Sequence, residues 1–259
     1  MIKPVLHYFN LADEVVSFST TRHGGVSKGK LATLNINPHR GDEPSAVAEN
    51  LQAVAAEIGV QADKVIRLHQ IHETHCLTVT DAFLNLSVAE QYEMEEGKDA
   101  VVTDCRNVCI GVHTADCVPI LFYEPVHHAI GAAHAGWRGT VQRIAQHTLR
   151  KMTELYGTDP KELKAVVGPC ISLKNFEVGQ EVYDTFSAAG FPMERIARMY
   201  EKWHINLPLC NQLQLEELGV PAANIIQSGI CTYDNASDFF SARILKEGFG
   251  TIYTGIALK

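Results

Sequence analysis

Apolar and polar positions along the chain predict strands and helices in mixed order. Strand-like apolar runs occur at residues 14–19, 76–80, 100–103, 108–112, 118–123, 129–133, 164–167, 225–230 and 251–257. Apolar positions at helical spacing, or a helix-like composition, predict helices at 45–58, 140–156, 178–188 and 206–218. Because these elements do not alternate as regular βαβ units, the pattern favours an α+β sandwich over a doubly wound parallel sheet.

Local signals predict where two of the helices begin and end. Ser45 is expected to cap the first helix, and Gly59 to end it. Thr140 is expected to cap the second helix before it ends at Gly157, with one face formed by Ile144, Thr148, Met152 and Leu155. Residues 81–97 are polar and acidic, and we expect them to form a surface excursion.

The runs 118–123 and 129–133 are typical of a hairpin around a proline-containing turn. A two- or four-residue loop centred between Pro125 and Val126 would place Cys117 opposite His134. Cβ atoms of opposed residues are about 4.5–5.5 Å apart, which is close enough for a thiolate and an imidazole to share one metal ion. The register therefore predicts a pair of metal ligands.

A metal ion needs at least a third protein ligand, and the histidines at 69, 72 and 75 precede the strand-like run 76–80. Strand alternation puts residues 69 and 75 on opposite faces, but periodicity does not choose among the three. A Cys-His-His set is the zinc pattern that leaves a fourth position open for water. Imidazole and thiolate ligands also suit copper.

Three further segments carry candidate binding chemistry, each with a plainer structural interpretation. Segment 136–139 places Arg138 at a helix start, which suits phosphate but is equally a tight strand-to-helix turn. The loop 22–25 joins Arg22 to two glycines, which allow a ligand close to the backbone or simply form a turn. Asp116 either orients a ligand imidazole or caps its turn.

Composition limits the classes of protein and partner. The 259 residues are 46% hydrophobic and contain no linker or repeat, so we expect one domain over residues 1–259. A formal charge of −8 without a basic cluster argues against nucleic acid as a principal partner. Apolar runs are too short for a membrane span, and no signal core precedes Asp13, so a cytoplasmic protein is expected. The seven cysteines are an odd number, which favours reduced thiols.

Several motifs occur together from about residue 17 to 245. They are Thr21-Arg22-His23-Gly24-Gly25-Val26-Ser27, Leu34-Asn35, Gly41-Asp42, Gln70-Ile71-His72, Asp99-Ala100-Val101-Val102-Thr103, Ala115-Asp116-Cys117-Val118-Pro119, His134-Ala135-Gly136-Trp137-Arg138-Gly139, Gly168-Pro169, Glu177-Val178-Gly179, Cys231-Thr232 and Phe239-Phe240-Ser241. In this combination the chain resembles the laccase-domain family, first described as multicopper polyphenol oxidases and now regarded as zinc-dependent purine nucleoside phosphorylases with adenosine deaminase activity.

The resemblance implies a four-layer α-β-β-α sandwich with mixed β-sheets. It implies a zinc ion held by His72, Cys117 and His134, with a zinc-bound water as the catalytic group. The implied reactions are phosphorolysis of adenosine, inosine, guanosine and methylthioadenosine, and deamination of adenosine. Purine nucleosides and phosphate are then the small-molecule partners, no protein partner is implied, and Arg22, Asn35 and Arg138 are candidates for binding substrate or phosphate.

The chain departs from the family pattern in three places. Asn206 stands where an aspartate usually precedes the leucine, Ala242 replaces an aromatic residue, and Phe249 follows Gly248 where an arginine is usual. These changes affect the expected substrate range more than the metal site.

Three other functional hypotheses compete with that of a zinc enzyme. Copper-dependent phenol oxidation requires several linked clusters of ligands, whereas this chain offers one compact set. A metal-free cysteine hydrolase would use Cys117 as the nucleophile and His134 as its base. A metal- or nucleotide-binding regulatory module would show no turnover.

Overall fold

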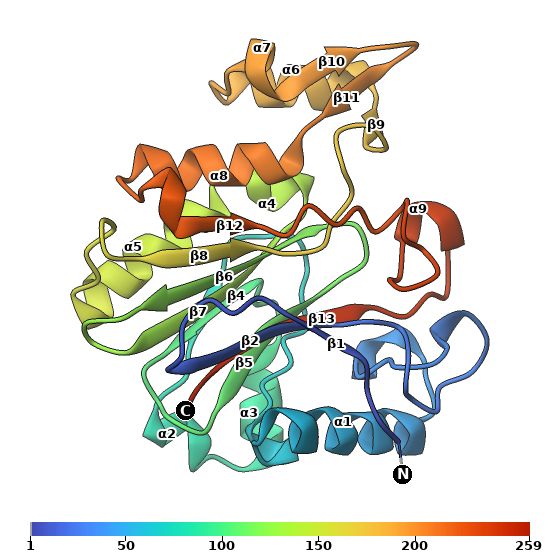
Figure 1. The fold of residues 1–259 in the computed structure, drawn as a ribbon, viewed down its shortest axis with the longest axis vertical. Coiled ribbons are helices and arrows are strands. Elements are labelled where there is room, and N and C mark those ends of the chain that lie inside the picture. Colours follow the sequence, from blue (N-terminus) through green and yellow to red (C-terminus); the bar gives the residue numbers. More distant parts are fainter. Residues whose placement is uncertain (1) are drawn as a thin grey trace.

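The computed structural model describes residues 2–259, in which two β-sheets are stacked face to face between helices (Figure 1). The four-stranded sheet has the order β1 (Leu6–Tyr8), β2 (Val15–Thr20), β13 (Ile252–Leu258) and β5 (Cys109–Thr114). The six-stranded sheet has the order β12 (Ile225–Gln227), β8 (Lys164–Val167), β6 (Val118–Glu124), β7 (Ala129–Ala135), β4 (Ala100–Thr103) and β3 (Cys76–Thr78). Both parallel and antiparallel pairs occur in the larger sheet.

The side-chain alternation of β6 explains why both faces of its sheet are covered. Its residues are all buried, and successive side chains of a strand point to opposite faces. Ile120 and Phe122 pack with the helices on the outer face, while Leu121 and Tyr123 pack between the two sheets. The second cluster also contains Val112 and Ile256 from the four-stranded sheet, so the two sheets share one apolar interior.

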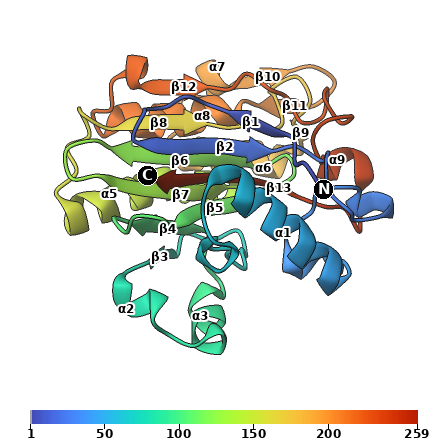
Figure 2. The ribbon, with the colours of Figure 1, turned by 60° about the horizontal axis from the view of Figure 1, so that its bottom comes forward.

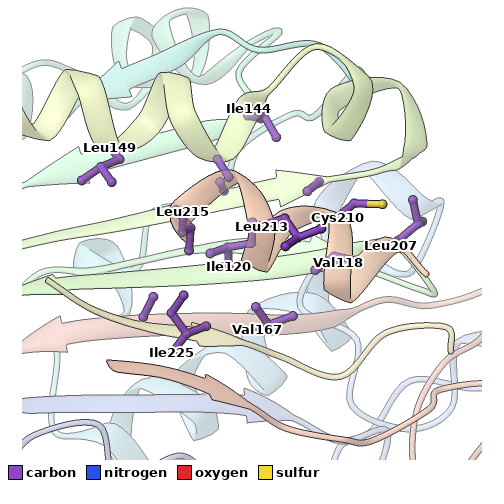
Figure 3. Close-up of a cluster of buried hydrophobic side chains, with 14 of the residues drawn as sticks. Val118, Ile120, Ile144, Leu149, Val167, Leu207, Cys210, Leu213, Leu215 and Ile225 are labelled. Atoms are coloured by element: carbon purple, nitrogen blue, oxygen red, sulfur yellow. The ribbon is translucent and has the colours of Figure 1, made fainter. Parts of the chain in front are cut away.

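Helices complete the outer layers. α4 (Trp137–Val141), α5 (Ile144–Tyr156) and α8 (Leu207–Glu217) cover the six-stranded sheet. Figure 3 shows apolar side chains of α5 and α8 meeting those of β6 and β8. α1 (Pro44–Ile58) covers the other sheet and buries Val54 and Ala55 against Phe18 and Tyr253. The expected four-layer α-β-β-α sandwich is confirmed, with a mixed six-stranded sheet and a four-stranded sheet whose pairs are all antiparallel.

The remaining elements extend from this sandwich. A small sheet of β10 (Ala197–Met199), β11 (Trp203–Ile205) and β9 (Glu177–Val178) lies beyond α8 with α6 (Gln180–Ala188) and α7 (Met193–Ile196) (Figure 1). α2 (Asp81–Leu84) and α3 (Val88–Glu95) project below the sheets in Figure 2, and α9 (Ala242–Leu245) precedes β13. Within residues 2–259, no helix combines the length and apolar character that a membrane crossing requires.

Several predicted boundaries need correction. The surface excursion expected at 81–97 is present, and its largely helical structure, in which Ser87 and Glu90 cap α3 reciprocally, was not predicted. Ser45 does not cap α1, because the helix already begins at Pro44, whose fixed φ suits the first helical position.

The helix expected to begin at Thr140 is in fact two helices. Thr140 lies inside α4, and its hydroxyl donates to the Ala135 carbonyl at 3.4 Å. Arg143, at a left-handed φ of 65°, separates α4 from α5. Gly59 and Gly157 end their helices as expected, with φ values of 76° and 70°.

The hairpin register was predicted wrongly by two residues. His134 lies opposite Pro119, not Cys117, and Glu124 pairs with Ala129 so that the loop comprises residues 125–128. The buried Glu124 carboxylate accepts the backbone N–H groups of the next turn, at 2.8 Å from Val126 and 2.7 Å from His127, and this extends β6. Because side chains alternate with a period of two, a two-residue shift keeps a side chain on the same face of its sheet.

One prediction tests which part of α5 contributes to the core. Leu149 is 0% exposed and Leu155 is 41% exposed, although periodicity assigned Leu155 to the apolar face. We expect Leu149→Ala to lower the free energy of unfolding by about 2–5 kcal/mol because it leaves a cavity against β7. The same change at Leu155 should cost within about 0.5 kcal/mol. Urea unfolding of both variants measures this, and equal costs would contradict the packing.

Candidate metal centre and its pocket

His72, Cys117 and His134 converge at one end of the six-stranded sheet. His72 precedes β3, Cys117 lies in the turn between β5 and β6, and His134 is in β7. One ligand atom from each residue lies within 4.8 Å of the others, and Cys117 Sγ is 3.9 Å from His72 Nε2. Ligand atoms on a tetrahedral zinc are roughly 3.3–3.6 Å apart, from Zn–S and Zn–N bonds of about 2.3 and 2.0 Å. The three side chains therefore fit one metal ion after a small contraction.

The buried Asp99 carboxylate organises two of these three residues. Its oxygens accept the backbone N–H groups of Ile71, His72 and Glu73 at 3.1, 3.0 and 2.9 Å. The ring nitrogen Nδ1 of His134 lies 2.7 Å from Asp99 Oδ1. The backbone N–H of His134 donates to the backbone carbonyl of Asp99, also at 2.7 Å. Because a carboxylate accepts only, this contact assigns a proton to Nδ1, and Nε2 is the nitrogen that binds a metal once its own proton is displaced.

The same carboxylate holds His72 in an uncommon backbone conformation. His72 has φ of 68°, in the left-handed region that non-glycine residues seldom adopt. Three successive N–H donors turned toward one anion offset the cost of this conformation, which is on the order of 1–3 kcal/mol. Asp99 therefore sets both the path of the 71–73 loop and the direction of the His72 side chain.

Gly136 makes room for the converging ligands. A Cβ atom at this position would lie 2.9 Å from His72 Cδ2 and 3.2 Å from Cys117 Sγ. Such contacts are tighter than side chains normally tolerate, so any larger residue would push the imidazole and the thiol apart. The first glycine of the His134-to-Gly139 motif thus serves close packing at the centre.

The electrostatics of the group favour a thiolate. Burial alone would raise the pKa of Cys117, but the imidazoles of His134 and His72 outweigh burial and lower it to about 6. Burial alone would lower the pKa of His134, but the Cys117 sulfur and the Asp99 carboxylate raise it to about 9. A thiolate is the form of cysteine that binds metals and acts as a nucleophile.

The other two early histidines lie outside this group and are paired with carboxylates. His69 pairs with Glu96 at 2.5 Å and stacks on His39 with ring centroids 4.0 Å apart. His75 pairs with Glu73 at 2.9 Å and is exposed. Of the three histidines near β3, His72 alone joins Cys117 and His134.

The arginine and asparagine candidates for binding substrate or phosphate lie outside the group. Arg22 uses Nε and one terminal nitrogen on the carbonyls of Ala32 and Ala236, at 3.0 and 2.9 Å. Asn35 is fully buried, and its amide nitrogen donates to Asp42 at 2.9 Å. Arg138 is exposed, with its guanidinium stacked 4.4 Å from the Trp137 ring centroid.

Asp116 serves the turn and not an imidazole. Its carboxylate accepts hydrogen bonds from the Thr232 hydroxyl at 2.6 Å, the Ser241 hydroxyl at 3.0 Å and the Arg243 N–H at 2.7 Å. These bonds attach the segment before β13 to the turn that carries Cys117. Asp99, which the sequence motifs contain without any assigned role, makes the contact to the imidazole instead.

A solvent-open pocket of about 230 Å³ adjoins the three converging residues. All three line it, together with residues that the sequence did not single out as functional: Asn37, His39, Arg40, Gln70, His113 and Thr251. Two of the three departures from the family pattern, Ala242 and Phe249, also line this pocket. The third, Asn206, caps α8 by accepting the Leu209 N–H at 3.1 Å, which an aspartate would do equally well.

Comparison with known proteins identifies curated enzymes that match nearly the whole chain. A purine nucleoside phosphorylase of Bacteroides thetaiotaomicron is 40% identical, and the alignment covers 99% of this chain and 97% of that protein. Adenosine deaminase RL5, from an unknown prokaryotic organism, is 35% identical over 98% of both chains. These similarities support an enzyme.

Solved structures and a family model match equally long stretches. The crystal structure of the Bacillus licheniformis hypothetical protein YfiH superposes with a TM-score of 0.91 at 30% identity, covering 99% of this chain and 97% of that one. YlmD from Geobacillus stearothermophilus gives 0.89 at 29% identity, covering 97% and 94%. The model of the multi-copper polyphenol oxidoreductase laccase family matches residues 16–259. The chain therefore belongs to the multi-copper polyphenol oxidoreductase laccase family.

Proposed function

We propose that the protein is a zinc-dependent purine nucleoside phosphorylase, acting on adenosine, inosine, guanosine and methylthioadenosine, that also deaminates adenosine. The observation that carries this proposal is the convergence of His72, Cys117 and His134 beside an open pocket. Relatives of nearly the same length are named purine nucleoside phosphorylase and adenosine deaminase, which supports both reactions. The described residues contain one such group of ligands, whereas multicopper oxidation needs several, and this favours zinc over copper.

Each residue of the centre has a separable task in this proposal. Zinc, when bound by His72, Cys117 and His134, would supply Lewis acidity at its open position, which activates water or polarises a substrate. Asp99 keeps the His134 proton on Nδ1 and orients the ring. The paired amide bonds of Gln70 with the His113 backbone, at 2.8 and 2.7 Å, fix the loop before His72 against β5.

Phosphorolysis makes a second demand on the pocket. A phosphate oxygen forms a bond to C1′ of the ribose while the C1′–N9 bond breaks, and the purine leaves with the bonding electron pair and takes up a proton. The pocket must therefore hold an anion beside the nucleoside in the correct orientation. Deamination needs water but no phosphate, so the two reactions differ in a component that can be added or withheld.

A metal-free cysteine hydrolase is a second candidate, favoured by the order of Cys117, His134 and Asp99. A nucleophile, a base and an orienting carboxylate would then act in sequence. This hypothesis assigns no role to His72, whose Nε2 lies 3.9 Å from Cys117 Sγ. It requires full activity in the presence of a strong chelator, whereas the zinc enzyme loses activity under that treatment.

The first prediction for this function concerns metal content. The purified protein should contain about one zinc per chain, and Cys117→Ala or His72→Ala should lose most of it because two ligands hold zinc poorly. Elemental analysis measures this. Cys105→Ala and His75→Ala are matched controls that should retain zinc, since neither residue belongs to the group. Full zinc occupancy in Cys117→Ala would disprove the assignment.

A second prediction concerns Asp99. Asp99→Asn should weaken zinc binding about 10- to 100-fold, because the neutral amide no longer orients His134 or anchors the 71–73 loop as a carboxylate does. Competition with a chromophoric chelator measures the affinity. Asp104→Asn, a change of the same kind at an exposed position just after β4, is the control. Equal affinities in the two variants would show that the carboxylate does not support the metal.

A third prediction concerns products. Adenosine without phosphate should give inosine and ammonia, and adenosine with phosphate should also give adenine and ribose 1-phosphate, since only phosphorolysis consumes an anion. Chromatography of the purines and a ribose 1-phosphate assay follow both routes. If zinc-containing protein forms neither set of products, the enzyme proposal fails and a binding module remains.

A further inference from the structure

Arg40 is held firmly at the wall of the pocket. It ends a short 3-10 helix (Pro38–Arg40) that Asn37 caps by accepting the His39 N–H at 2.9 Å. Gly41 follows at φ of 71°, a left-handed conformation that suits glycine and turns the chain away. The backbone at Arg40 is therefore defined on both sides.

The Arg40 side chain is fixed by two contacts with one residue. Its Nε donates to the Phe249 carbonyl at 3.0 Å, and its guanidinium carbon lies 4.3 Å from the centroid of the Phe249 ring. These contacts use one edge and one face of the guanidinium. Within residues 2–259, neither terminal nitrogen of Arg40 has a hydrogen-bond or ion-pair partner. A planar pair of N–H₂ groups is therefore left to bind a ligand.

The surroundings of Arg40 favour an anion. Among the described residues that line the pocket, none is an aspartate or a glutamate, although the chain as a whole has a formal charge of −8. His39 and His113 line the pocket together with Arg40, and burial lowers the pKa of both, so their neutral rings offer hydrogen bonds and leave Arg40 as the cationic group beside them. An arginine keeps its charge in proteins, and its fork of donors matches two oxygens of a phosphate.

The two arginines that sequence motifs suggested for phosphate are less suitable. Arg22 has its Nε and one terminal nitrogen occupied by backbone carbonyls, and it does not line the pocket. Arg138 is exposed outside the pocket, and α4 is too short at five residues to form an anion site by itself. Of these three arginines, Arg40 alone combines a fixed guanidinium, free donors and a place on the pocket wall.

We propose that Arg40, held by Phe249, binds the phosphate co-substrate through its two terminal nitrogens. This inference rests on the proposed phosphorolysis and adds the residue that positions its anion. Phe249, one of the departures from the family pattern, then supports the phosphate site through both its carbonyl and its ring. Binding of inorganic phosphate at this position would place the anion beside a nucleoside that reaches toward Cys117 and the two histidines.

The test compares Arg40→Gln, Arg40→Lys and the control Arg195→Gln, which removes the same charge from an exposed position on α7. Calorimetric titration with inorganic phosphate, in the absence of nucleoside, measures binding. Steady-state kinetics measures KM separately for phosphate and for inosine. We expect Arg40→Gln to raise the Kd and KM for phosphate roughly 10- to 100-fold, the loss typical of charge-assisted hydrogen bonds. The KM for inosine should change much less, Arg40→Lys should be intermediate, and Arg195→Gln should match the wild type.

Chemical modification of the wild-type protein provides a measurement that does not depend on folding of a variant. Phenylglyoxal modifies accessible arginines, and peptide mass spectrometry locates the modified residues. Phosphate should slow modification of Arg40 and leave that of Arg195 unchanged. Equal modification of Arg40 with and without phosphate would overturn the assignment.

The outcomes separate this inference from the proposed function. Phosphorolysis with an unchanged phosphate KM in Arg40→Gln refutes the Arg40 site and leaves the phosphorylase intact. Loss of phosphate binding in Arg138→Gln, but not in Arg40→Gln, likewise refutes it and assigns the anion to the start of α4. Arg40-dependent phosphate binding in a protein that forms no ribose 1-phosphate supports the anion site and refutes the phosphorylase.

Discussion

The buried carboxylate of Asp99 is the interaction on which the centre depends. It lies at the start of β4, where it binds three successive N–H groups of the loop before β3 and the imidazole of a residue on β7. A buried charge is costly unless hydrogen bonds compensate for its lost hydration. Here those compensating bonds come from the two segments that carry His72 and His134. The requirement to satisfy one carboxylate therefore brings the two imidazoles together.

The apolar pattern predicted most of the sandwich because the sheets are buried on both sides and their strands are continuous apolar runs. Residues 100–103 were predicted as a strand and form β4. The hairpin register was missed because it depends on Glu124, a charged residue at a strand end whose carboxylate is buried in the turn that follows. A glutamate at a strand end is usually exposed to solvent, so the predicted strand ended one residue too early, at Tyr123.

The residues of the candidate metal centre and its pocket were predicted only in part. Cys117 and His134 stand in distinctive short motifs, whereas the choice of His72 came from the family resemblance and not from periodicity. The roles of Asp99 and Arg40 were not predicted from the sequence. Both roles depend on contacts between residues far apart in the chain, and such contacts produce no motif with a recognisable spacing. Net charge was similarly uninformative: a chain with charge −8 contains a pocket without carboxylates, because local potential depends on placement and not on the total.

The anchoring of the segment before β13 by Asp116 has an evolutionary consequence. Thr232, Ser241 and the Arg243 backbone are tied to the turn that carries Cys117, whereas Ala242 beside them and Phe249 further along line the pocket. Residues that fix the segment and residues that face the ligand are thus different positions of one stretch of chain. Substitutions at Ala242 or Phe249 can therefore alter the pocket wall while the hydrogen bonds that hold the turn carrying Cys117 stay in place. The shape of the pocket can thus change through single substitutions without a compensating change at the turn.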